Sequence, residues 1–345
     1  MRPRKEDIMK AIGLYENLPI EDEKSLIDVI INKPCAEGKD LLVKVKAIAV
    51  NPVDYKIRKK RPTDNGPQIL GWDVAGIVEA VGEGCELFAP GDEVYYAGDI
   101  SRQGGNSEFH LVDERIVGKK PKSLSFEQAA AIPLTGITAY ESLFDRLRIS
   151  KVASENKDTS VLIIGAAGGV GSMAIQLAKH VGLTVIGTTS RPESTRWAKD
   201  LGADYTINHY KEFLPQLQAI GLEDVDFILC FNVTDAHWKN MAATIKPQGT
   251  ICSIVETDDP IDLNELKTKS VGFVWELMFT RSLFKTEDMI KQHLLLNDIA
   301  AMIDDGIIHT TVNEILTPIN AENLRKAHKM LEEGSTIGKI VLLDF

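Results

Sequence analysis

Apolar and polar residues in the first third of the chain follow a pattern of short strands. Residues 41–50 alternate and then run apolar, and further apolar segments follow at 74–82 and 92–98. Glycine and proline separate these segments, and the proline-glycine pair at 90–91 is typical of a tight turn. The pattern predicts a β-rich region that serves mainly as a scaffold.

Beyond residue 134, strand-like and helical segments alternate. An alanine-rich helical sequence follows Ser125, whose spacing to Gln128 resembles a capping box. Apolar strands are expected at residues 160–165, 184–190, 226–231 and 250–255. Because helical segments separate these strands, we expect a parallel sheet covered on both faces, and hence an α/β fold.

Composition and charge place the chain among ordinary globular proteins. Its 345 residues correspond to about two domains, and 44% hydrophobic with 26% charged residues are typical of a globular protein in water. The net charge of -11 disfavours binding to nucleic acid and to anionic membranes. Four scattered cysteines and the lack of a secretory signal predict a cytoplasmic protein with reduced thiols.

The chain contains a 20-residue stretch without charge, residues 159–178, in which four glycines argue against a membrane helix. It includes an A-x-G-x-x-G turn between a strand and a helix, the context of a dinucleotide-binding βαβ unit. Gly168 would let the backbone approach a pyrophosphate, and Gly171 would let the helix pack on the strand. The predicted cofactor-binding residues of the turn are Ala166, Gly168, Gly169, Val170 and Gly171. The alternative is a glycine-rich turn that only packs.

The end of the second strand of this unit indicates the cofactor. An NAD site places a carboxylate there for the ribose 2'-hydroxyl, whereas an NADP site needs cations and hydroxyl donors. The chain has Ser190 and Arg191 at this place, with Arg196 about one turn later. These residues favour NADPH, the alternative being that the two arginines are solvated charges on a helix.

Several motifs together resemble one family. In chain order they are NPVDYKIR (51–58), GWDVAGIVEAVGEGC (71–85), PGDEVYYAG (90–98), AAAIPLTGITAYESLF (129–144) and AAGGVGSMAIQLAK (166–179). They resemble the medium-chain dehydrogenase/reductase superfamily, and within it the quinone oxidoreductase branch and its zinc-type alcohol dehydrogenase-like subgroup. The resemblance implies a GroES-like β-rich catalytic domain over residues 1–134, a Rossmann domain with a doubly wound parallel sheet over 135–300, and a returning segment over 301–345. It also implies a homodimer.

Zinc-containing members of this family carry metal ligands at three positions that differ here. The resemblance places Asn51 at the position of a cysteine, Trp72-Asp73 at that of a His-Glu pair, and Leu134 at that of a third ligand. A catalytic zinc ion needs three protein ligands. We therefore expect no metal at this site; the alternative is a zinc-dependent alcohol dehydrogenase with unusual ligands.

Without a metal to polarise a carbonyl, the favoured substrates are acceptors that are already electrophilic. Quinones and α,β-unsaturated aldehydes or ketones accept hydride at carbon and need mainly orientation and hydrogen bonds. The sequence thus predicts an NADPH-dependent oxidoreductase for small molecules of this class. An NADPH-binding regulatory protein without turnover is the alternative from another class.

Three residues are candidates for the chemistry. Asn51 could hydrogen-bond the nicotinamide ribose or a substrate carbonyl, or simply start a turn before proline. Tyr55 could donate a proton, and Trp72 could stack on a conjugated acceptor or fill the place of the metal. The resemblance adds three cofactor residues, namely Thr138 beside the nicotinamide, Phe231 at a strand end and Lys339 toward a phosphate. A basic segment, KIRKKR at 56–61, is either a solvated loop or steers the anionic cofactor.

Overall fold

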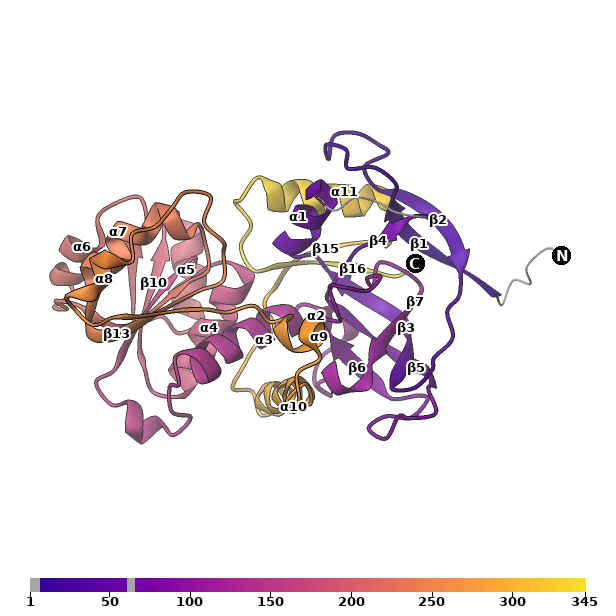
Figure 1. Cartoon of the computed structure of the whole chain (residues 1–345), viewed down its shortest axis with the longest axis horizontal. Helices are drawn as coiled ribbons and strands as arrows, with labels where there is room; N and C mark the ends of the chain where they lie inside the picture. Colours follow the sequence, from indigo (N-terminus) through magenta and orange to yellow (C-terminus); the bar gives the residue numbers. More distant parts are fainter. Residues whose placement is uncertain (1–6, 61–65) are drawn as a thin grey trace. The chain divides into compact units, whose positions relative to one another are not determined.

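The computed structural model describes residues 7–60 and 66–345, which form two compact units (Figure 1). The first combines the described residues up to Leu134 with Phe279–Phe345, and the second is Thr135–Met278. The second unit therefore ends well before residue 300, the limit predicted from the sequence. The reason is helix α10 (Lys291–Asp304), which packs against strand β8 (Val117–Lys119) of the first unit.

The first unit is built on two sheets. The larger has the strand order β15-β16-β3-β5-β6-β8, with β7 also paired to β3, and the smaller has the order β2-β1-β4. The strands are β1 (Ile8–Leu14), β2 (Ile27–Asn32), β3 (Asp40–Ala49), β4 (Gln68–Ile69), β5 (Val74–Val81), β6 (Glu93–Tyr96), β7 (Phe109–Asp113), β8, β15 (Val312–Leu316) and β16 (Lys339–Leu343). Strands from both ends of the sequence, indigo and yellow in Figure 1, thus share one sheet.

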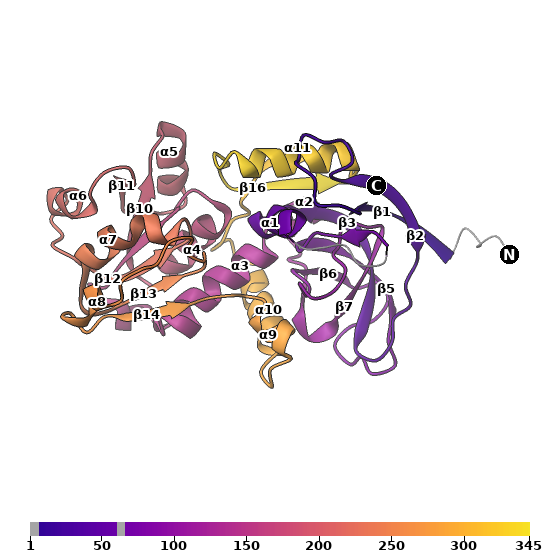
Figure 2. The same ribbon diagram turned by 45° about the horizontal axis from the view of Figure 1, so that its top comes forward.

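Helices of the first unit lie around these sheets. They are α1 (Pro52–Lys60), α2 (Phe126–Ala130), α9 (Thr280–Phe284), α10 and α11 (Ala321–Glu332), while α3 (Pro133–Tyr140) carries the junction to the second unit. Helix α11 packs against α1 and β16 (Figure 2). Helix α1 was not predicted from the sequence, although Pro52 at its first position and Asp54 in its first turn are typical helix-start residues.

The second unit is a six-stranded parallel sheet with the order β11-β10-β9-β12-β13-β14. Its strands are β9 (Ser160–Ile164), β10 (Thr184–Thr189), β11 (Tyr205–Asn208), β12 (Val225–Cys230), β13 (Ile245–Ser253) and β14 (Gly272–Trp275). Its helices are α4 (Gly169–His180), α5 (Pro192–Asp200), α6 (Phe213–Ala219), α7 (Thr234–Thr244) and α8 (Asn264–Lys267). Numbered within the unit, the order is 3-2-1-4-5-6, the doubly wound Rossmann arrangement, with helices on both faces (Figures 1 and 2).

The core of the second unit explains why the sequences of its strands are continuously apolar. Leu162, Ile228 and Ile251 come from three adjacent strands, and each is completely buried in one hydrophobic cluster with Trp238 of α7. A strand buried on both faces needs apolar residues at successive positions, since neither face meets water. None of the described helices is both long and apolar enough to cross a bilayer.

Candidate active site

The glycine-rich turn connects β9 to α4 in the second unit, and Gly168 caps the helix. A Cβ atom on Gly171 would lie 2.3 Å from the Gly165 carbonyl oxygen and 2.7 Å from the Ala166 Cα atom, so the helix can approach the strand only without a side chain there. A Cβ on Gly168 would meet a single atom, the Gly165 oxygen, at 3.4 Å. The fold therefore requires glycine at 171, whereas the space beside Gly168 is open.

The end of β10 carries the residues predicted to select the cofactor. Ser190 is half-buried and follows the strand, and Arg191 is exposed at the N-cap position of α5. Arg196 is exposed on the same helix. No carboxylate lies between the end of β10 and the start of α5, which leaves a hydroxyl and a cation where an NAD site has an acidic residue.

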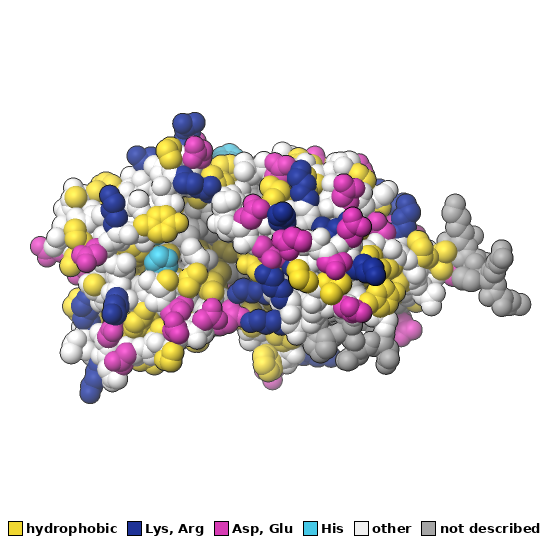
Figure 3. Space-filling model, turned by 90° about the horizontal axis from the view of Figure 1, so that it is seen from above, with side chains coloured by type: hydrophobic (Ala, Val, Ile, Leu, Met, Phe, Trp, Pro, Cys, Tyr) yellow, Lys and Arg dark blue, Asp and Glu magenta, His cyan; other side chains and the backbone are white. Residues whose placement is uncertain are grey.

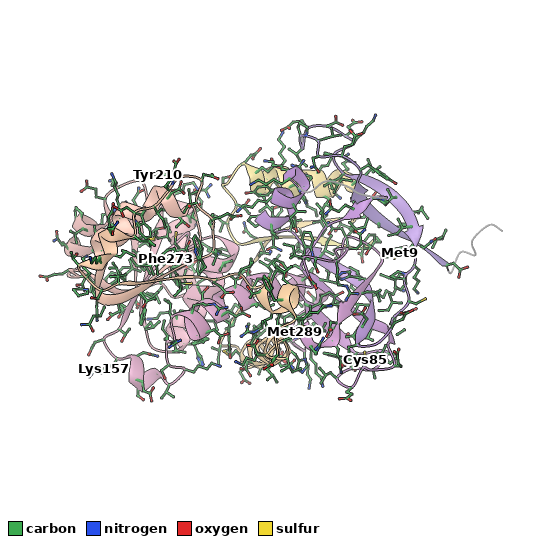
Figure 4. All side chains as sticks on the ribbon, viewed as in Figure 1. Met9, Cys85, Lys157, Tyr210, Phe273 and Met289 are labelled. Carbon is green, nitrogen blue, oxygen red and sulfur yellow. The ribbon has the colours of Figure 1, made fainter. Side chains whose placement is uncertain are left out.

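The parallel register of the sheet adds two residues that the sequence did not single out. Thr189 of β10 lies opposite Asn208 of β11, so His209 and Tyr210 leave the sheet next to Ser190. Tyr210, labelled in Figure 4, is 82% exposed, and burial lowers the pKa of His209. The signal that could have found them is their place directly after a strand that neighbours β10.

Two cofactor residues implied by the resemblance lie in the second unit. Phe231 directly follows β12, is half-buried, and its N–H donates to the Ile164 carbonyl oxygen at 3.0 Å. Thr138 is buried on α3. The structure thus puts Phe231 at the same sheet edge as the glycine-rich turn, since Ile164 ends β9.

A buried polar centre occupies the first unit, around the candidate residue Asn51. The Asn51 Nδ2 atom donates to Asp73 Oδ2 at 2.8 Å, and the Leu134 N–H donates to Asp73 Oδ1 at 2.7 Å. The Lys339 Nζ atom donates to Asp73 Oδ2 and to the Val50 oxygen, both at 2.9 Å, and to Asn51 Oδ1. Burial raises the pKa of Asp73, and the Lys339 charge opposes this rise. The three positions of the family's zinc ligands are therefore neighbours, because Lys339 bonds to Asn51 and Asp73, and Asp73 bonds to Leu134.

This geometry gives Lys339 a different place from the one expected. The resemblance implied that it reaches a cofactor phosphate, but its side chain is 3% exposed and all three hydrogens of its ammonium group have acceptors inside the first unit. We therefore assign Lys339 to the polar centre and not to the cofactor.

Asp54 lies beside the centre in the first turn of α1. Its Oδ2 atom accepts from the Asn51 N–H at 2.7 Å, which fixes the start of the helix. Its Oδ1 atom is buried and has no hydrogen-bond partner among the described residues. Burial raises the pKa of Asp54 to about 7, because the charged form is poorly solvated there.

Tyr55 and Trp72 are not brought into this hydrogen-bonded centre. The Tyr55 ring lies 5.2 Å from the Lys59 Nζ atom, and the pKa of Tyr55 is raised by burial and by the charge of Glu332. Trp72 is completely buried, donates from Nε1 to the Asp99 oxygen at 3.2 Å and packs edge-on against Phe279. In this structure Trp72 therefore fills the core and presents no free ring face.

Most of the basic segment at 56–61 forms the second half of α1, and Arg61 lies outside the described residues. Arg58 is completely buried and is paired with Glu332, to which Lys59 also bonds at 2.6 Å. Basic and acidic side chains are interspersed on the face drawn in Figure 3. Two cations of the segment are thus held by α11, and residues 56–60 are helical where a loop was one of the predicted alternatives.

The residues at the polar centre do not fit a catalytic zinc ion. Asn51 and Leu134 supply neither thiolate nor imidazole, and both carboxylate oxygens of Asp73 already accept hydrogen bonds. Within the described ranges, no group of three or more His, Cys, Asp or Glu side chains is arranged to hold a metal ion. The family's usual three-ligand set is therefore replaced by other chemistry.

Comparison with known proteins gives two family models. Residues 37–122 match the alcohol dehydrogenase GroES-like domain, and residues 169–292 match the zinc-binding dehydrogenase model. These ranges fall mainly in the first and second units, respectively.

Similar proteins cover nearly the whole chain. A zinc-type alcohol dehydrogenase-like protein of Staphylococcus aureus is 46% identical over 97% of this chain and 99% of its own length. A quinone oxidoreductase of Lama guanicoe is 30% identical over 97% and 98%. The crystal structure of a Rhizobium etli protein, whose name assigns it to the zinc-dependent alcohol dehydrogenases, is 47% identical and superposes with a TM-score of 0.94 over 98% of both chains. The chain is therefore an oxidoreductase of the medium-chain dehydrogenase/reductase superfamily.

Proposed function

We propose that this protein is an NADPH-dependent oxidoreductase that reduces quinones or α,β-unsaturated carbonyl compounds and uses no catalytic zinc. The observation that carries the proposal is the polar centre of Asn51, Asp73 and Lys339, which offers hydrogen bonds but no metal-ligand set. Acceptors that are electrophilic by themselves suit such a site, because they need orientation and no Lewis acid. In support, one similar protein is named a 2-methylene-furan-3-one reductase, from Solanum lycopersicum, and is 42% identical over 52% of this chain.

The second unit supports the choice of cofactor. The open space beside Gly168 and the N-terminus of α4 fit a pyrophosphate, and Ser190 with Arg191 fits a ribose 2'-phosphate. Bound NADPH would supply the hydride. A quinone oxidoreductase of Escherichia coli, solved with NADPH, is 26% identical with a TM-score of 0.80 over 97% of this chain.

In the first unit, Asn51 would donate a hydrogen bond to the acceptor oxygen or to the nicotinamide ribose. A carbonyl oxygen gains negative charge as its conjugated carbon accepts hydride, so a donor aimed at that oxygen stabilises the transition state. One proton is then needed to complete the two-electron reduction, and we assign it to solvent, because the Tyr55 hydroxyl is not part of the polar centre.

The test is NADPH oxidation by the purified protein with quinones, 2-alkenals and simple aldehydes, with and without a chelator. We expect turnover of the first two classes and no effect of the chelator. NADPH oxidation that the chelator abolishes, or that is confined to simple aldehydes, would instead favour a zinc alcohol dehydrogenase. Tight NADPH binding with no turnover would favour a regulatory protein.

The cofactor assignment has its own test in Arg191→Ala. This variant should lose about tenfold or more in NADPH affinity, because a charge-assisted bond to the 2'-phosphate is removed, while NADH affinity should stay within about twofold. Lys199→Ala, in the last turn of the same helix and not among the predicted cofactor residues, is the matched control for general charge loss. Equal losses for both cofactors in Arg191→Ala would argue against the assignment.

The homodimer implied by the resemblance is also part of the proposal. Strand β14 is an edge of the six-stranded sheet, and Trp275 at its end is 49% exposed, so a second copy could pair there. Light scattering at micromolar concentration would show twice the monomer mass. The cytoplasmic location stays a prediction of the sequence.

A further inference from the structure

Lys339 is the only described cation bonded to the polar centre, and its position is fixed on three sides. It starts β16, which pairs antiparallel with β3, so its side chain extends toward the segment that follows β3. Its Nζ atom donates to a carboxylate, an amide oxygen and a main-chain oxygen. An ammonium group has three hydrogens and no acceptor, so its bonding capacity is filled.

Two of the three partners of this ammonium lie at the family's metal-ligand positions. Asp73 and Asn51 bond to it directly, and the Leu134 N–H reaches it through the carboxylate of Asp73. Asp73 is completely buried, and a buried carboxylate requires a compensating charge. A divalent metal could supply that charge in a zinc enzyme; here a lysine supplies it.

The same arrangement determines which way the Asn51 amide points. Lysine only donates and an ionised carboxylate only accepts, so Asn51 must turn Oδ1 toward Lys339 and Nδ2 toward Asp73. One Nδ2 hydrogen is used by Asp73, and the other has no acceptor among the described residues. Asn51 is 1% exposed, and one N–H bond of its side chain is left over with its direction fixed.

We propose that the Lys339 ammonium takes the place of the family's zinc ion as the resident cation of this centre, and that with Asp73 it is a positioning group that aims the remaining N–H of Asn51. The part concerning Asn51 rests on the proposed reductase function. The part concerning the cation does not, and it is tested without turnover.

Whether the Lys339 ammonium compensates the Asp73 charge is tested by thermal unfolding of the full chain. Lys339→Met leaves Asp73 uncompensated and should lower the melting temperature by roughly 10 °C. Adding Asp73→Asn removes the stranded charge, so the double variant should regain at least half of that loss. The matched control is Lys269, whose Nζ atom donates to three main-chain oxygens at 2.8 to 2.9 Å and to no carboxylate. Asp73→Asn should not rescue Lys269→Met.

Zinc itself provides the second measurement. The wild-type chain is incubated with zinc chloride, desalted and analysed for metal by mass spectrometry. We expect far less than one zinc per chain. One zinc per chain that disappears in Asp73→Asn would overturn the proposal, as would additive stability losses for Lys339→Met and Asp73→Asn.

Positioning is tested by non-additivity in turnover. Asn51→Ala should lower kcat/KM about tenfold, the loss of one hydrogen bond to developing charge. If Lys339 and Asp73 act through Asn51, the triple variant Asn51→Ala with Lys339→Met and Asp73→Asn should have the same kcat/KM as Asn51→Ala alone. Losses that multiply would refute positioning. If the wild type reduces none of the acceptors, the proposed function fails, and the stability and zinc measurements still decide the identity of the cation.

Discussion

Two glycines of the turn between β9 and α4 should respond differently to the same substitution. Gly171→Ala places a Cβ atom 2.3 Å from a main-chain oxygen, about 1 Å closer than ordinary contact. The two nearest atoms, the Gly165 oxygen and the Ala166 Cα atom, both belong to the main chain, so α4 must move away from β9. Overpacking of this kind costs about 1–3 kcal/mol, which for a unit of this size is a fall in melting temperature of roughly 2–12 °C.

Gly168→Ala meets only one atom at 3.4 Å, and the backbone φ of -73° at Gly168 suits alanine. The substitution also reduces the freedom of the unfolded chain, which offsets the poorer N-capping by alanine, so the free energy of unfolding should stay within about 1 kcal/mol of the wild-type value. The added methyl group nevertheless stands where the pyrophosphate backbone contact is expected, and NADPH affinity should fall about tenfold or more.

The assay combines thermal unfolding without cofactor and NADPH titration by fluorescence, on the two variants and the wild type. The expected pattern is a stable Gly168→Ala that binds poorly, beside a destabilised Gly171→Ala. Wild-type affinity in a well-folded Gly168→Ala variant would refute the assignment of this turn to the cofactor. Unchanged stability in Gly171→Ala would refute the packing argument.

Two further predictions concern the first unit. Burial lowers the pKa of His110 to about 4 from 6.5. Below pH 6.5 the unfolded chain therefore binds a proton at His110 that the folded chain does not bind. The free energy of unfolding decreases as the pH falls toward 4. Between pH 7.5 and 5 this amounts to about 2 kcal/mol; urea unfolding should show a weaker acid dependence in His110→Gln, and identical dependences would contradict it. Glu332→Gln leaves the buried Arg58 charge without its carboxylate and should cost about 3–5 kcal/mol, whereas Glu79→Gln at the exposed pair with Lys33 should cost below about 1 kcal/mol. Equal losses in urea unfolding would show that burial of the pair is unimportant.

The second unit follows its sequence closely because its pattern is local. The predicted strands at 160–165, 184–190 and 226–231 are β9, β10 and β12, whereas the short edge strands β11 and β14 were not predicted. The start of β13 at Ile245 was missed, since Lys246 and Gln248 interrupt the apolar run. Gln248 has a φ of 67°, and the pairing register shifts in this region.

The polar centre depends on contacts that no local pattern contains. Lys339 is 266 residues from Asp73 and 288 from Asn51, so its role becomes visible only when β16 pairs with β3. Helix α1 escaped prediction for a different reason. Its residues are mostly polar, and Arg58 and Asp54 are buried by pairing and capping and not by hydrophobicity.

The insertion of β16 between β15 and β3 also sets an order of events during synthesis. The second unit, Thr135–Met278, is continuous in sequence, so all of it can leave the ribosome before β16 is made. The first unit cannot complete its sheet until Lys339 has emerged, roughly 10–40 s after residue 134 at typical rates of translation. During that interval β3 lacks its neighbour on one edge and Asp73 lacks its cation. The nascent chain is thus exposed to aggregation through the first unit, while its second unit is already able to fold.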